Sequence, residues 1–227
     1  MIIATFFYYL SQIDVTTRQG INYVVTEKKI PLYLKALTFI TRDVQMRYLV
    51  KEITLNGKTD SEKIESIFQW TISHILPQPK TLPVVDDHPW HIVIRGYGKR
   101  DQINDIFSIL CSYLGLKTYF DIFEHPLSHE RHQMALIHYK EQWIIFDVCH
   151  QTYFISGKEW ASLEQLKNRQ FAIKKFGHRT PVLSREYYVT LFSHYVISEK
   201  RSIRTQEQVP YKRVWIELKR WLYGKNN

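Results

Sequence analysis

Cysteine, glycine and proline are scarce in this chain of 227 residues, and each shortage excludes a class of protein. The two cysteines, Cys111 and Cys149, cannot form the disulfide framework of a small secreted domain. Eight glycines and eight prolines, beside 44% apolar and 15% aromatic residues, exclude a collagen-like or low-complexity chain. The composition is that of one globular domain with a sizeable buried core.

Long hydrophobic runs are also lacking. The most apolar run, residues 2–10, is far shorter than the ~20 residues of a membrane span, and no basic residue precedes it. We interpret this run as a buried strand or a short helix. An interfacial anchor and the remnant of a longer hydrophobic segment are the alternatives. With no signal peptide or membrane span recognised, a cytoplasmic location is expected.

Positive charge is in excess, with a net charge of +9 at pH 7. An anionic partner such as nucleic acid or an acidic membrane surface would suit this charge. The basic residues look scattered along the chain, without a Lys/Arg block or a nucleic-acid-binding motif. We therefore interpret the charge as a solvated surface and do not expect nucleic-acid binding.

Apolar spacing and turn residues divide the N-terminal half into elements. Residues 20–25 are typical of a short strand. A long helix is predicted between Pro31 and the Asn56-Gly57 turn. Its apolar residues at helical spacing are Leu34, Leu37, Ile40 or Thr41, Val44, Tyr48 and Ile53. A capping box of Thr59 and Glu62 begins a second helix, which ends before Pro77. Residues 77–90 are predicted to be a surface loop and residues 92–94 a short strand.

The central and C-terminal parts carry clearer patterns. Residues 101–114 are apolar on one helical face and are followed by Gly115, a residue typical of helix ends. Strands are predicted over residues 117–123, 131–139 and 142–148, with Lys140-Glu141 joining the last two as a hairpin. Further helices are predicted over residues 158–169, 185–196 and 209–223. The last is amphipathic, so docking on the domain is expected and membrane-surface binding is the alternative. Its apolar face holds Val214, Trp215, Leu218, Trp221 and Leu222, opposite Lys212, Arg213, Lys219 and Arg220.

Residues suited to catalysis concentrate between Gly96 and Asp147. A Gly-Tyr-Gly lead runs into a helix start at Arg100-Asp101-Gln102, a strand carries His132, and the next strand reads Trp-x-x-x-Asp up to Asp147. A Cys-His-Asp thiol enzyme places its sulfur at a helix N-terminus, where the helix dipole lowers the thiol pKa, and holds an imidazole with a carboxylate. This order of elements resembles the transglutaminase-like superfamily, a papain-related fold, over residues 62–153.

The resemblance implies an α+β fold with a helical N-terminal lobe, an antiparallel sheet and a helical C-terminal extension. The corresponding segments are 1–58, 59–155 and 156–227. His132 and Asp147 would be the remnants of a catalytic triad, while Arg100 stands at the position of the family's cysteine. The cleft would be lined by Trp90, Arg100, Asp101, Gln102 and Trp143.

Arg100 decides the function that the resemblance implies. A guanidinium group is not a nucleophile and stays protonated at physiological pH. The resemblance therefore implies a pseudoenzyme that binds a peptide, an anionic group or a partner protein in the old cleft, without a cofactor.

Other interpretations stay open. Arg100 could simply face solvent at a helix start, and His132 and Asp147 could be an ordinary cross-strand pair. Cys149, beside His150, is the alternative nucleophile of an active acyltransferase, amidase or protease-like enzyme. A basic peripheral membrane or nucleic-acid-binding module is a further alternative.

One cysteine and three histidines are expected to have no catalytic or metal-binding role. Cys111 lies on the apolar face of its helix and is expected in the core. His125, His129 and His132 are spaced like metal ligands, but no cysteine or acidic pattern supports them. No bound metal is therefore expected.

Overall fold

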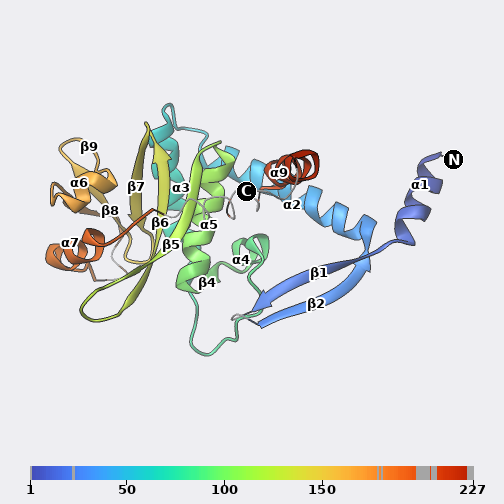
Figure 1. The fold of residues 1–227 in the computed structure, drawn as a ribbon, viewed down its shortest axis with the longest axis horizontal. Helices are drawn as coiled ribbons and strands as arrows, with labels where there is room; N and C mark the ends of the chain where they lie inside the picture. Colours follow the sequence, from blue (N-terminus) through green and yellow to red (C-terminus); the bar gives the residue numbers. More distant parts are fainter. Residues whose placement is uncertain are drawn as a thin grey trace.

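The computed structural model describes residues 2–21, 24–177, 179, 181–197, 205 and 209–223. It has a mixed α/β architecture, in which an antiparallel six-stranded sheet lies between two groups of helices (Figure 1). An N-terminal arm extends to one side of this body (Figure 1). The mixed architecture and the antiparallel sheet agree with the prediction from the sequence. No helix among the described residues is both long and apolar enough to cross a membrane.

The arm consists of α1 (Ile2–Ser11), the strands β1 (Asp14–Ile21) and β2 (Val24–Pro31), and the beginning of α2 (Leu32–Ile53). The two strands form an antiparallel hairpin in which Gly20 lies opposite Val25. The single strand predicted over residues 20–25 is therefore wrong, because the chain reverses direction within it. Residues 2–10 are helical, but Phe6, Tyr8 and Tyr9 are exposed and not buried.

The long helix predicted after Pro31 is confirmed as α2, but its core-facing side could not be predicted. Met46 and Val50 are buried against the body of the protein. Ile53, one of the apolar residues whose spacing predicts the helix, also packs against the core, but five others lie on the opposite, exposed side. These are Leu34, Leu37, Ile40, Val44 and Tyr48. The helix is thus apolar on two faces, and the less regular of the two packs inward.

The second predicted helix is α3 (Asp60–His74), and its capping box forms as expected. The Glu62 amide donates to Thr59 Oγ1 at 3.2 Å, and the Thr59 amide donates to Glu62 Oε2 at 3.3 Å. On the buried face of α3, Phe68 is fully inaccessible and meets aromatic rings from α5 and the sheet. This contact anchors α3 on the sheet.

A helix replaces the strand predicted over residues 92–94. This helix is α4 (Pro89–Arg95), flanked by the two-residue strands β3 (Leu76–Pro77) and β4 (Tyr97–Gly98), which pair in parallel. Pro89 starts the helix at a position where its missing N–H leaves no hydrogen bond unmade, and Gly96 ends it at a φ of 70°. These two end signals outweigh the strand preference of three β-branched residues.

The central helix α5 (Arg100–Tyr113) and the strands after it match the prediction closely. The strands are β5 (Lys117–Glu124), β6 (Arg131–Tyr139) and β7 (Gln142–Asp147). Lys140 and Glu141 have φ values of 48° and 60°, as a two-residue hairpin turn requires. Three further strands were not predicted, namely β8 (Thr152–Ser156), β9 (Glu159–Trp160) and β10 (Ala172–Lys175). The strand order is β10-β8-β7-β6-β5, with β9 paired to β8.

Three more helices complete the described part of the chain: α6 (Leu163–Lys167), α7 (Arg185–Ser193) and α9 (Pro210–Tyr223). The helix predicted over residues 158–169 is correct only for α6, because Glu159 and Trp160 pair with β8 and Ser162 caps the helix that follows. Helices α6 and α7 cover one face of the sheet, and α3 and α5 cover the other. The site residues lie where β6, β7, α5 and α7 come together.

Candidate functional site

His132 and Asp147 lie on the same face of the sheet. Side chains alternate along a strand, so His132 shares the side of Met134, and Asp147 shares the side of Ile145. Met134 and Ile145 both pack in the core beneath α7. Arg100 begins α5, which covers the opposite face. The three residues predicted from the sequence therefore gather around one end of the sheet, with Arg100 on a helix that packs on the opposite face from His132 and Asp147.

Asp147 is buried and fully engaged in hydrogen bonds. Its Oδ2 accepts from Tyr188 Oη at 2.8 Å and lies 2.8 Å from His150 Nδ1. Its Oδ1 accepts from the His150 amide at 3.0 Å. Burial and the neighbouring carboxylate raise the pKa of Tyr188, so this phenol is a donor at neutral pH. The described residues contain no hydrogen bond between His132 and Asp147, and His150 takes the place that the sequence suggested for His132.

His132 is held by a short chain of hydrogen bonds to Tyr187 on α7. Its Nε2 lies 2.6 Å from Tyr187 Oη, which donates to Glu130 Oε2 at 2.7 Å. The phenol has one proton, so when that proton goes to Glu130 the imidazole Nε2 must be the donor to Tyr187. The lone pair of a neutral His132 is then on Nδ1. Burial lowers the pKa of His132, and the nearby Asp147 opposes this shift only in part.

Arg100 is exposed in the first turn of α5. Its backbone carbonyl accepts from Asn104 Nδ2 at 2.8 Å. Its guanidinium forms no ion pair with any described residue. The positive charge of Arg100 nevertheless helps to lower the pKa of His132. Arg100 thus presents a cation at a helix N-terminus, where the helix dipole adds to the positive potential.

The sulfur of Cys149 lies beside this same turn of α5. Its Sγ is 3.4 Å from Asn104 Nδ2 and 3.6 Å from the Arg100 carbonyl oxygen. Burial raises the pKa of Cys149 to about 12, and Asp147 adds to the shift, so the sulfur is a thiol at neutral pH. The other cysteine, Cys111, is buried in the core as the sequence predicted.

The Gln102 side chain connects two segments of the chain through hydrogen bonds. It is buried, and its side chain bonds the Asp86 carbonyl, the Asp87 carboxylate, the Lys99 amide and the guanidinium of Arg95. These bonds tie the loop before α4 to the first turn of α5.

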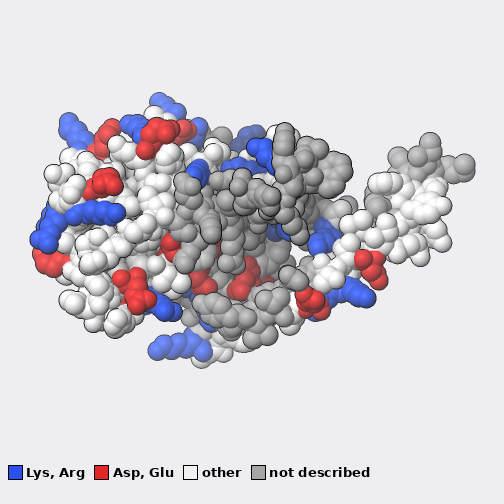
Figure 2. Space-filling view, in the orientation of Figure 1, with Lys and Arg blue, Asp and Glu red and all other residues white. Residues whose placement is uncertain are grey.

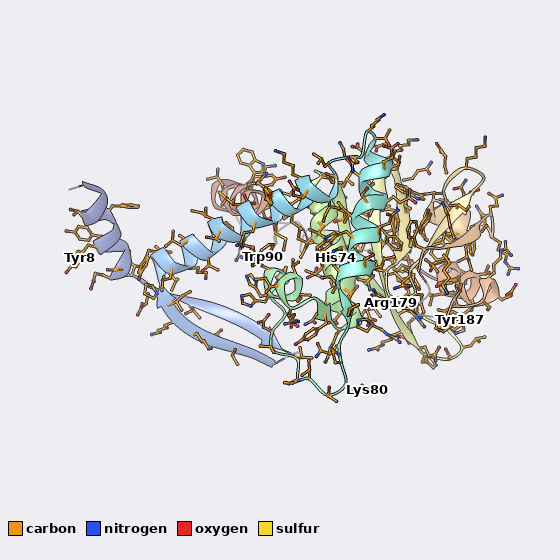
Figure 3. All side chains as sticks on the ribbon, turned by 180° about the vertical axis from the view of Figure 1, so that it is seen from behind. Tyr8, His74, Lys80, Trp90, Arg179 and Tyr187 are labelled. Carbon is orange, nitrogen blue, oxygen red and sulfur yellow. The ribbon has the colours of Figure 1, made fainter. Side chains whose placement is uncertain are left out.

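The two tryptophans predicted to line the cleft do not join the site. Trp143 is the second residue of β7, four residues or roughly 13 Å from Asp147, and its ring packs on Tyr119. Trp90 is half-buried against the core from α4, and Figure 3 shows it far from Tyr187. Asp101 remains half-exposed in the first turn of α5.

The histidines considered as metal ligands have other partners. His125 is buried and stacks on Tyr187, with ring centroids 4.3 Å apart. His129 is exposed and lies 3.3 Å from Glu124. Within the described ranges, no group of three His, Cys, Asp or Glu side chains is arranged to hold a metal ion.

Several residues of the site were not predicted from the sequence. His150 follows Asp147 by three residues, and an aspartate side chain at a turn often accepts a hydrogen bond from a backbone amide a few residues later. This spacing is the sequence feature that could have indicated the pairing of His150 with Asp147. Asn104 lies one helical turn after Arg100. Tyr187 and Tyr188 come from a helix about 40 residues further along the chain, and no local pattern marks them.

Comparisons with known proteins add a weak likeness of fold. No protein-family model and no curated protein matches the chain. A solved structure from Cytophaga hutchinsonii, described as a "putative cysteine protease", aligns with a TM-score of 0.39 at 15% identity, over 47% of this chain and 37% of that one. A "putative protease" from Parabacteroides distasonis aligns with a TM-score of 0.37 at 9% identity, over 59% of this chain and 35% of that one. The chain therefore spans less than two fifths of either protein.

Proposed function

We propose that this chain is a transglutaminase-like pseudoenzyme that binds a carboxylate or another anionic group of a peptide or partner protein at the N-terminus of α5. The observation that carries the proposal is the exposed Arg100 guanidinium, which has no ion-pair partner among the described residues and stands where the resemblance places the nucleophile. A protonated thiol and a neutral imidazole lie close to it.

The chemistry of this turn favours an anion. The first amides of a helix have no intrahelical acceptor, so they can donate to a bound oxygen. An arginine can form two parallel hydrogen bonds to one carboxylate, which fixes its orientation as well as its position. The buried carboxylate of Asp147 already accepts hydrogen bonds from His150 and Tyr188 and forms no ion pair with Arg100.

The binding test uses N-acetyl-diglycine, a peptide with one free carboxylate, and inorganic phosphate as probes in calorimetric titration. We expect Arg100→Gln to weaken binding about tenfold or more, because a hydrogen bond to a charged group contributes about 1.5–3 kcal/mol. Arg131→Gln is the matched control, since Arg131 begins the strand of His132 but already pairs with Glu124 at 3.3 Å. Equal binding by wild type and Arg100→Gln, or no binding of either probe, contradicts the proposal.

The second candidate function is a thiol enzyme that uses Cys149. One observation favours it, which is that the sulfur lies at the first turn of α5 and close to the Asp147–His150 pair. A carboxylate bonded to imidazole Nδ1 is the arrangement that orients a catalytic histidine. Against it stands the raised pKa of Cys149, since the thiolate is the nucleophilic form.

Alkylation by iodoacetamide near neutral pH separates the two candidates. A thiol with a pKa of about 12 holds very little thiolate. We therefore expect Cys149 in the folded protein to react at least about a hundredfold more slowly than in the chain unfolded in urea. Mass spectrometry of the labelled peptides distinguishes it from Cys111.

The Arg100→Cys variant is the positive control of this experiment. A cysteine introduced there should react faster than Cys149 in the same molecule, because the helix N-terminus stabilises its thiolate. Fast, stoichiometric labelling of Cys149 in the wild type would instead support the thiol enzyme.

A further inference from the structure

The outward face of α2 is an apolar stripe with no described element covering it. Leu34, Leu37, Ile40, Val44 and Tyr48 recur every three or four residues, so they line one side of the helix over about 20 Å. Val44 is 59% exposed and Tyr48 is 65% exposed. The core-facing residues Met46 and Val50 are on the other side of the helix. The stripe therefore contributes nothing to the core.

A second apolar stripe lies on α9. It consists of Tyr211, Val214, Trp215 and Leu218, all of them exposed. Lys212 anchors this helix by donating to the Ser112 carbonyl at 3.1 Å. Arg47 of α2 lies over the Tyr211 ring at 4.7 Å, so the two helices are in contact (Figure 1). We call the two stripes together the arm surface.

The excess positive charge belongs to the segments that carry the arm surface. Residues 59–197 contain 15 basic and 15 acidic residues, so this part of the chain has no net charge. Residues 1–58 contain eight basic and four acidic residues, and residues 198–227 contain eight and three. The basic residues are spread along the whole chain, but the acidic residues balance them only in the segment that holds the sheet, so the net charge of +9 lies outside that segment. Figure 2 shows basic and acidic side chains intermixed over the body.

Basic side chains border the apolar stripes directly. Arg47 and Lys51 are exposed on α2, and Arg213 and Lys219 are exposed on α9. Lys219 lies over the Trp215 ring at 5.5 Å. Tyrosine, tryptophan and basic residues around an apolar strip are the composition of surfaces that lie in the boundary between lipid headgroups and acyl chains.

We propose that the arm surface binds the surface of an anionic phospholipid bilayer, with its apolar side chains in the headgroup boundary and its basic side chains on the phosphates. A second copy of the chain fits less well, because a symmetric pair would bring two positively charged surfaces together. Nucleic acid fits less well too, because binding to a phosphate backbone relies on basic residues and would leave the two apolar stripes exposed to water. The charge-free helix α1, with Tyr8 exposed, extends the arm beyond α2 (Figures 1 and 3).

Co-sedimentation of the full chain with vesicles tests the proposal. We expect vesicles containing about 30% phosphatidylglycerol to bind at least about tenfold more protein than pure phosphatidylcholine vesicles. Raising the salt from about 0.1 M to about 0.5 M should reduce this binding at least fivefold, because salt screens the attraction between the basic residues and the lipid.

Two variants locate the binding surface. Val44→Glu combined with Trp215→Glu should lower binding to the anionic vesicles at least about tenfold, because each change puts an acidic group into the apolar stripe. Lys51→Glu combined with Arg213→Glu should do the same through charge alone, without touching the apolar residues. Leu127→Glu is the matched control, since Leu127 is equally apolar and 82% exposed but lies between β5 and β6, outside the arm surface. It should change binding by less than about twofold.

Three results would overturn the proposal. The first is equal binding to neutral and anionic vesicles, or none to either. The second is unchanged binding by both arm variants when circular dichroism shows that they are folded. The third is a dimer in sedimentation velocity without lipid that Val44→Glu with Trp215→Glu dissociates, which would assign the arm surface to a second copy of the chain.

Discussion

Replacement of Asp147 by alanine should lower the free energy of unfolding by about 2–4 kcal/mol. The carboxylate is buried and accepts from the Tyr188 hydroxyl, the His150 ring and the His150 amide. Removing it leaves both His150 donors without this acceptor and leaves the Tyr188 hydroxyl with only its 3.3 Å contact to the Thr152 hydroxyl, and each unsatisfied buried group costs about 1–3 kcal/mol. Urea unfolding followed by tryptophan fluorescence measures the change.

Asp101→Ala is the control for this variant. Asp101 is also a carboxylate at the same end of α5, but it is half-exposed, so its removal should cost less than about 1 kcal/mol. If Asp147→Ala were as stable as Asp101→Ala, the hydrogen bonds around Asp147 would not exist in solution. Asp147 would then not hold His150 and Tyr188 in place.

Replacement of Phe68 by alanine should cost about 3–5 kcal/mol, the usual range for a buried phenylalanine. The ring is fully inaccessible and lies 5.4 Å from the ring of Phe146 and 5.7 Å from that of Phe107. The loss combines the transfer of the side chain to water with the cavity that remains between α3, α5 and the sheet. The free energy of unfolding in urea again gives the value.

The comparison variant is Phe6→Ala, because Phe6 is 59% exposed on α1. Its free energy of unfolding should stay within about 0.5 kcal/mol of the wild type. A small loss for Phe68→Ala, close to that of Phe6→Ala, would mean that α3 is not packed on the sheet in this way.

Elements with local end signals were predictable from the sequence, and those fixed by distant partners were not. The helix α3 has its own capping box, and α5 is followed by Gly115 at a φ of 89°, so their positions followed from the sequence. The short strands β8, β9 and β10 exist because each pairs with a neighbour in the sheet, and their own residues give little sign of it. Propensity is a weak guide for such strands, since packing against neighbours decides them.

The orientation of α2 could not be predicted from the sequence either, for a different reason. Hydrophobic spacing says that a helix has an apolar side, but it does not say what covers that side. On α2 the regular stripe through Val44 faces outward, while Met46 and Val50 face the core. The sequence therefore predicted the helix and could not predict its orientation.

The proximity of the candidate site residues could be predicted from the order of the elements, whereas their hydrogen bonds could not. Arg100, His132 and Asp147 lie at one end of the sheet, near the first turn of α5, and the order of elements suggested this region. The partners of these residues depend on side-chain directions that the sequence does not reveal. Asp147 bonds to His150, and His132 bonds to Tyr187 from a helix far along the chain.

The separation of charge along the chain gives the molecule an electric dipole moment. The segment that holds the sheet is neutral as a whole, whereas the arm and α9, which share one side of that sheet, are basic (Figure 1). In the field of a negatively charged surface such a molecule experiences a torque that turns α2 and α9 toward that surface. At physiological salt the field decays over about 8 Å, so this rotation occurs only in the last step of approach. The direction in which the protein meets a charged surface is thus set before any apolar side chain makes contact.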